Sequence, residues 1–128
     1  MKARLDEMIT PEQAVTLHGL FVERARRSPD KFAYRHFKQE QWRDLSWREM
    51  LAEVGRWQAA LSTLKLQRGD RVAIMLRNCP QWVMFEQAAM SLGLAVVPLY
   101  TVDRPDNIAY IVKDADVKVL LLENAEQW

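Results

Sequence analysis

Cys79 is the only cysteine of the 128-residue chain, and it stands where an apolar run gives way to a helix start. A helix N-terminus lowers a thiol pKa and so favours a nucleophilic thiolate. A nucleophile also needs a base, and no motif links His18 or His36, the two histidines, to this cysteine. These spacings do not form a metal-ligand pattern either. We expect a buried structural cysteine and no metal site, with a hydrolase or redox role for Cys79 as an alternative.

The sequence also lacks a phosphate-binding motif. Its four glycines, at positions 19, 55, 69 and 93, match neither the dinucleotide fingerprint nor the Walker pattern. The paired carboxylates of Asp114 and Asp116 flank a predicted turn, which fits helix-end charges better than an acid–base pair. The residues by themselves therefore predict no catalytic group in this chain.

Charge and hydropathy exclude several classes of partner. The 18 Lys and Arg residues nearly balance 17 Asp and Glu, so the net charge gives no general attraction to nucleic acid. No apolar run approaches the roughly 20 residues of a membrane-spanning helix, and a secretory leader is not evident. We expect a cytoplasmic protein. Residues 24–48 are locally basic and interleaved with aromatic residues, which leaves open contact with nucleic acid or peripheral contact with the lipid headgroups of a membrane, although a solvated face is the favoured interpretation.

The first half of the chain predicts a helix followed by a hairpin. Residues 1–15 are weakly patterned, and we expect a loosely ordered lead-in. Thr16 can cap a helix that continues to about Ser28. Residues 32–37 and 41–45 are expected to form two short strands joined by a turn.

A second helix is predicted to begin after a capping-box pattern. The Ser46 hydroxyl and the Glu49 carboxylate can each satisfy a backbone donor at the helix start. Apolar residues then recur at steps of four and three, which predicts one buried stripe. The members of this stripe are Met50, Val54, Trp57, Leu61 and Leu64.

The second half alternates strands and helices. Residues 71–76, 94–99 and 117–122 are short apolar runs typical of buried strands. Helices are expected to begin near Pro80 and within residues 103–106, and the first is apolar enough to be covered on more than one side. This order predicts an α/β fold, with a partial parallel sheet, right-handed crossover helices and a short N-terminal β-hairpin.

Three parallel strands leave two open edges, and this bears on the organisation of the domain. We expect the sheet to be completed by further protein. One hypothesis is therefore a piece of a larger enzyme. The other is a stand-alone α/β interaction or dimerisation module that self-associates through its open sheet edges.

Five short sequence segments follow one another in a recognisable order. They are Leu-Ser-Trp-Arg-Glu-Met at 45–50, Lys-Leu-Gln-Arg-Gly-Asp-Arg-Val-Ala-Ile at 65–74, Leu-Arg-Asn-Cys-Pro-Gln-Trp at 76–82, Ser-Leu-Gly-Leu-Ala-Val-Val-Pro-Leu-Tyr at 91–100, and Tyr-Thr-Val-Asp-Arg-Pro-Asp-Asn-Ile-Ala-Tyr-Ile at 100–111. Taken in this order, they resemble the adenylate-forming ligases, the AMP-dependent synthetase/ligase superfamily. The last of them is most similar to the branch that contains long-chain fatty acid–CoA ligases.

This resemblance implies a two-step enzyme that uses ATP, Mg2+ and coenzyme A. A fatty acid carboxylate would attack ATP to give acyl-adenylate and pyrophosphate, and the coenzyme A thiol would then displace AMP. The family carries its chemistry in a Ser/Thr/Gly-rich loop, a Tyr-Gly-x-Thr-Glu segment and a C-terminal domain with a catalytic lysine. None of these occurs in this chain. We therefore expect residues 16–128 to be an inactive N-terminal fragment whose partner is the remainder of the same polypeptide, and which binds ATP weakly or not at all.

Four residues remain as candidates for the neighbourhood of substrate. Ligands of open parallel sheets collect at the carboxyl ends of the strands. In this chain those ends hold Asn78 and Trp82 after one predicted strand, and Tyr100 and Thr101 after the next. Core packing of Trp82 is the alternative.

Overall fold

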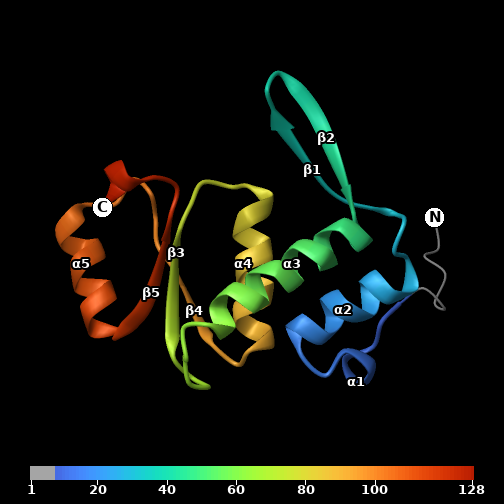
Figure 1. Cartoon of the computed structure of the whole chain (residues 1–128), viewed down its shortest axis with the longest axis horizontal. Coiled ribbons are helices and arrows are strands. Elements are labelled where there is room, and N and C mark those ends of the chain that lie inside the picture. Colours follow the sequence, from blue (N-terminus) through green and yellow to red (C-terminus); the bar gives the residue numbers. More distant parts are fainter. Residues whose placement is uncertain (1–7) are drawn as a thin grey trace. The chain divides into compact units, whose positions relative to one another are not determined.

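A computed structural model describes residues 8–128 of the chain (Figure 1). These residues belong to two compact units, with the boundary between Glu53 and Val54. Among the residues that the structure describes, a hairpin and a three-stranded parallel sheet account for the strands, as the sequence predicts. The described elements are α1 (Pro11–Ala14), α2 (Leu17–Arg27), β1 (Phe32–Lys38), β2 (Gln41–Ser46), α3 (Trp47–Ser62), β3 (Arg71–Met75), α4 (Pro80–Ser91), β4 (Ala95–Pro98), α5 (Pro105–Asp114), β5 (Val117–Leu122) and the 3-10 helix η2 (Ala125–Gln127).

The segment before α2 contains a short helix that the sequence prediction did not include. Thr10 caps α1 through a capping box, in which its hydroxyl accepts from the Gln13 amide and its own amide donates to the Gln13 side chain. Residues 1–7 of the predicted loosely ordered lead-in lie outside the described residues. That the chain divides at residue 15 remains a prediction.

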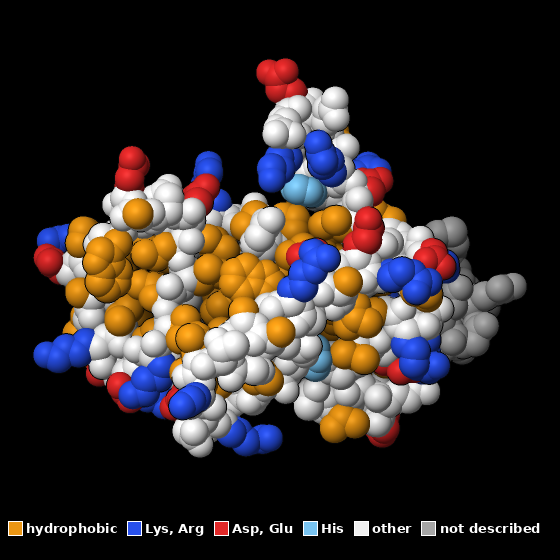
Figure 2. Space-filling view, in the orientation of Figure 1, with side chains coloured by type: hydrophobic (Ala, Val, Ile, Leu, Met, Phe, Trp, Pro, Cys, Tyr) orange, Lys and Arg blue, Asp and Glu red, His pale blue; other side chains and the backbone are white. Residues whose placement is uncertain are grey.

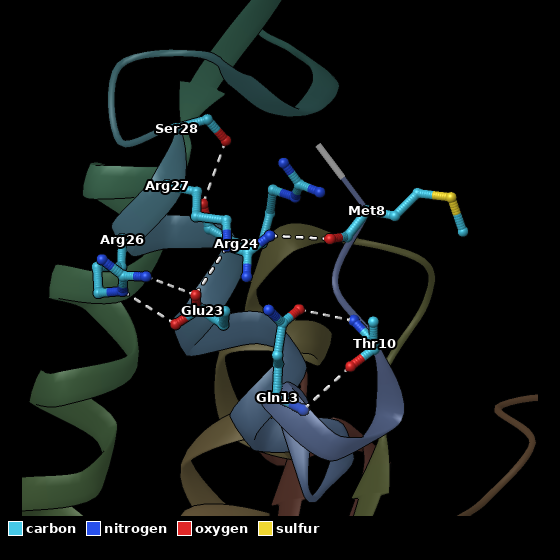
Figure 3. Close-up of polar contacts among 8 residues, drawn as sticks. All are labelled: Met8, Thr10, Gln13, Glu23, Arg24, Arg26, Arg27 and Ser28. Carbon is cyan, nitrogen blue, oxygen red and sulfur yellow. Dashed lines mark hydrogen bonds and ion pairs between the residues drawn. The ribbon is translucent and has the colours of Figure 1, made fainter. Parts of the chain in front are cut away.

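Charged side chains of α2 hold this segment in place (Figure 3). Arg26 and Arg27 both bind the Glu23 carboxylate, at 2.6 and 2.7 Å, and Arg27 also donates to the Met8 carbonyl at 2.8 Å. The hydrogen bond from Arg26 is the largest cause, and that from Arg27 the next, of a pKa of Glu23 lowered to about 2.

The predicted cap of α2 is confirmed, because the Thr16 hydroxyl accepts a hydrogen bond from the Gly19 amide.

The hairpin is also confirmed, with strands one residue longer than predicted. β1 and β2 pair antiparallel from Phe32↔Ser46 to Lys38↔Gln41, with one irregularity between Phe32 and Tyr34. Gln39 and Glu40 form the two-residue turn with φ values of 51° and 60°. Two consecutive positive φ values suit the right-handed twist of a hairpin, which is why the turn works here without the usual glycine.

The capping box before α3 forms as predicted. The Ser46 amide donates to the Glu49 carboxylate at 2.7 Å, and the Glu49 amide donates to the Ser46 hydroxyl at 3.2 Å. Of the predicted stripe, three members are buried: Met50, Val54 and Leu61. The prediction was wrong at Leu64, which lies beyond the end of α3 and is 50% exposed.

β3 is the central strand of the parallel sheet in the second unit, in the order β4-β3-β5. Residue alternation gives β3 two apolar faces. Val72 and Ile74 are fully buried on one face, whereas Ala73 and Met75 belong to a core cluster that includes residues of α5. Figure 1 shows α4 and α5 on opposite sides of this sheet.

The helix α4 is covered on more than one side, as its composition predicts. Gln81 is the one exposed residue within Pro80–Ser91. The ring of Phe85 meets Trp57 of α3 edge-to-face, with centroids 5.4 Å apart, and burial raises the pKa of Glu86. This helix therefore packs as a core element.

Two open sheet edges remain within the described residues. There, β4 and β5 each pair with β3 only, and most of β5 is half-buried. In the part of the chain that the structure describes, no helix is long and apolar enough to cross a membrane.

Candidate functional site

A cavity of about 490 Å3 opens at the carboxyl ends of β3 and β4. It brings together the four residues that the sequence nominated near substrate. That these four residues contact substrate remains a prediction, whereas the structure does place them around one cavity. The lining residues are Leu76, Arg77, Asn78, Trp82, Pro98, Leu99, Tyr100 and Thr101.

Local backbone structure positions one wall of this cavity. β3 ends at Met75, so the three following residues extend from the central strand. Pro80 then starts α4, where its fixed φ and missing amide donor suit the first helical position. Trp82 consequently lies in the first turn of α4, where it is half-buried, which agrees with a ring that both packs and lines the cavity.

The second wall follows β4. The Leu99 amide donates to the Ile74 carbonyl at 2.8 Å, which extends the pairing of β3 and β4 up to the cavity. Leu99 is buried, whereas Tyr100 and Thr101 are exposed. The cavity thus has an apolar floor and polar groups at its rim.

An ion pair joins the ends of the two neighbouring strands β3 and β5 at this rim. Arg77 binds Glu123 through two hydrogen bonds of 2.5 and 3.2 Å. These bonds lower the pKa of Glu123 and raise that of Arg77, so both groups are charged at neutral pH. The sequence prediction missed this pair. The pair could have been predicted, because Arg77 and Glu123 carry opposite charges and each follows closely after a predicted parallel strand.

The prediction of a buried structural cysteine was wrong in one respect, because Cys79 is half-buried. It is the N-cap residue of α4, at the rim of the sheet, and its side chain makes no capping hydrogen bond. Among the described residues, no three His, Cys, Asp or Glu side chains come together where they could hold a metal ion. The site is therefore suited to binding, with apolar, amide, hydroxyl and guanidinium groups, and it contains no arrangement of nucleophile and base.

Comparison with known proteins gives a consistent result. The family described as AMP-binding enzyme matches residues 21–127. The long-chain-fatty-acid–CoA ligase of Bacillus subtilis (strain 168) is 35% identical over 109 residues, which cover 83% of this chain and 18% of the ligase. The long-chain-fatty-acid–CoA ligase ACSBG2 of Gallus gallus is 30% identical over 130 residues, which cover 99% of this chain and 17% of the ligase.

A solved structure shows the same fold. The N-terminal subdomain of Klebsiella oxytoca NpsA, in complex with 3-hydroxyanthranilyl-AMSN, superposes with a TM-score of 0.76 and 27% identity. The match covers 88% of this chain and 28% of that one. This chain spans less than a fifth of the length of the two curated ligases that it matches.

Proposed function

This chain belongs to the AMP-binding enzyme family, and from that premise we propose that it is the N-terminal part of a ligase that joins a long-chain fatty acid to coenzyme A. The observation that carries the proposal is the similarity of nearly the whole chain to two ligases of this activity. The alternative of a stand-alone interaction module has no comparable support.

The proposed reaction has two steps. A fatty acid carboxylate attacks the α-phosphorus of ATP, an oxygen–phosphorus bond forms, and pyrophosphate leaves with the electrons of the broken bond. The sulfur of coenzyme A then attacks the acyl carbon of the acyl-adenylate, and AMP leaves. Adenylation is needed because a free carboxylate is a poor electrophile. The described residues do not fit a Mg2+ site, so the proposal assigns the ion no ligand in this chain.

The role proposed for this chain is to position substrate at the carboxyl edge of the sheet. Trp82 would present its ring to an apolar part of the substrate, and Asn78 and Thr101 would donate or accept hydrogen bonds at the rim. Tyr100 is exposed beside them and would cover the bound group. A binding role is consistent with a cavity that combines apolar walls with a few polar groups.

A graft into a known ligase tests the proposed function. Residues of this chain would replace the matching segment of the Bacillus subtilis long-chain-fatty-acid–CoA ligase. We expect the chimera to form acyl-CoA from a long-chain fatty acid, ATP and coenzyme A, while the ligase without this segment is inactive. A chimera that melts cooperatively and binds ATP, yet forms no acyl-CoA, would contradict the proposal.

Substitution of Trp82 tests the proposed site in the same chimera. Truncation to alanine removes the indole ring from the cavity lining, so we expect the ratio of kcat/KM between long and short acyl chains to change by about tenfold. Trp128→Ala is the control, since Trp128 is 90% exposed and does not line the cavity. If Trp82→Ala leaves the acyl-chain preference unchanged, Trp82 does not belong to the site.

A further inference from the structure

The hairpin of β1 and β2 carries an exposed aromatic face. Phe37 and Trp42 lie directly opposite each other on the two strands, with ring centroids 5.4 Å apart, and are 60% and 67% exposed. Phe32 is exposed as well, and the guanidinium of Arg35 lies over its ring at 5.3 Å. Arg35 and Phe37 are two residues apart in one strand and therefore share a face. The three rings thus form one patch, here called the aromatic face.

The charges on this face cancel. Arg35 pairs with Asp44, its cross-strand neighbour, through hydrogen bonds of 2.6 and 2.9 Å. A closed, bidentate pair of this kind leaves no net charge among the three rings. The aromatic face is therefore an apolar surface with a neutral polar centre.

The opposite face of the hairpin is basic. Strand alternation places His36, Lys38 and Arg43 there, with His36 and Arg43 as cross-strand neighbours. Figure 2 shows Lys, Arg and His side chains gathered over the hairpin on the side that is turned to the viewer. The hairpin, residues 32–46, holds three Lys and Arg against two Asp and Glu, and one of these acids, Asp44, is paired with Arg35 on the aromatic face. The other basic side chains of the hairpin are therefore gathered on the face opposite the aromatic face.

We propose that the hairpin docks its aromatic face onto an anionic phospholipid surface. Tryptophan and phenylalanine rings favour the boundary between headgroups and acyl chains. Lys38 and Arg43 have long aliphatic stems that let their charges reach the surrounding headgroup phosphates. The turn residues Gln39 and Glu40 and the first residue of β2, Gln41, are polar, so the hairpin lies flat on the surface rather than entering tip first.

Nucleic acid has the same negative charge but fits this face less well. Single strands are bound by aromatic rings that stack on successive bases. Here Phe37 and Trp42 pack against each other, and the Asp44 carboxylate lies on the same face as the rings. The apolar area therefore forms one continuous patch, and such a patch fits a lipid interface better than it fits the separate bases of a single strand.

Vesicle co-sedimentation of the 128-residue chain tests the proposal. We expect binding to vesicles that mix phosphatidylcholine with phosphatidylglycerol, and much weaker binding to phosphatidylcholine alone. Charge reversal in Lys38→Glu/Arg43→Glu should lower the partition coefficient on the anionic vesicles by about tenfold or more. Phe37→Ser/Trp42→Ser should do the same on both kinds of vesicle. Tyr110→Ser/Trp128→Ser is the matched control, since it removes two exposed aromatic residues outside the hairpin and should leave binding unchanged.

Tryptophan fluorescence locates the contact and does not rely on a disruptive variant. The wild-type emission should shift to the blue on anionic vesicles, and Trp42→Phe should bind equally well while losing that shift. A blue shift that persists in Trp42→Phe overturns the proposal. The proposal is also overturned if the wild-type protein binds neither kind of vesicle. It also fails if hairpin substitutions change only the oligomeric state in light scattering, or only the binding of single-stranded RNA.

Discussion

Replacing Phe85 with alanine should lower the free energy of unfolding by about 3–5 kcal/mol. Phe85 is 2% exposed in the middle of α4, and its ring packs edge-to-face on Trp57. Truncation removes the transfer free energy of the ring and leaves a cavity that the close-packed surroundings fill only in part. Since small domains are stable by only about 5–15 kcal/mol, the variant should lose a large part of its stability.

Urea denaturation followed by circular dichroism measures this loss. Tyr110→Ala is the control, because Tyr110 is 68% exposed and its truncation should change stability by less than about 0.5 kcal/mol. A double-mutant cycle with Trp57→Ala should give a coupling of about 0.5–1.5 kcal/mol for the ring pair. A loss below about 1 kcal/mol for Phe85→Ala would mean that α4 is not the core helix of its unit.

The sequence predicts the elements of this fold because their signals are local. The capping box of Ser46 and Glu49, the proline at the start of α4 and the apolar run of Val117–Leu122 each determine structure within a few residues. The carboxyl-edge cavity was predictable for a related reason. Parallel strands place their ends on one edge, so Asn78 and Tyr100 had to come near each other once the strands were recognised.

Other features depend on contacts that no local pattern encodes. Gly19 is needed because a Cβ at this position would lie 1.8 Å from the Ala14 carbonyl oxygen, a close approach of α1 to α2. Nothing in the residues around Gly19 predicts that approach. Leu64 continues the helical spacing, yet α3 ends before it. The pairing of Arg77 with Glu123 joins residues 46 positions apart and required the strand order β4-β3-β5.

The glycines of this chain explain why we expect it to lack a nucleotide site of its own. A phosphate site in a parallel sheet needs a glycine-rich turn at the carboxyl edge, where backbone amides meet the phosphates. Gly69 and Gly93 precede β3 and β4, at the amino edge, and are joined by a hydrogen bond of 2.8 Å. Gly19 and Gly55 lie within α2 and α3. No glycine therefore stands beside the cavity of the proposed site.

The guanidinium group of Arg77, which lines that cavity, already binds a carboxylate. Arg77 could attract a phosphate, but its charge is neutralised by Glu123 through two hydrogen bonds. An incoming triphosphate would have to displace this carboxylate without help from a phosphate loop. Weak nucleotide binding is therefore expected from the chain alone, even though its family uses ATP.

Calorimetric titration of ATP into the 128-residue chain and into the chimeric ligase tests the central claim most directly, namely that this chain is a scaffold whose chemistry resides in other parts of a ligase. We predict clear binding heat for the chimera and, for the chain alone, a dissociation constant weaker than about 1 mM. Binding of ATP to the isolated chain with a dissociation constant near 1 μM, on the order of the affinity of a complete nucleotide site, would contradict it.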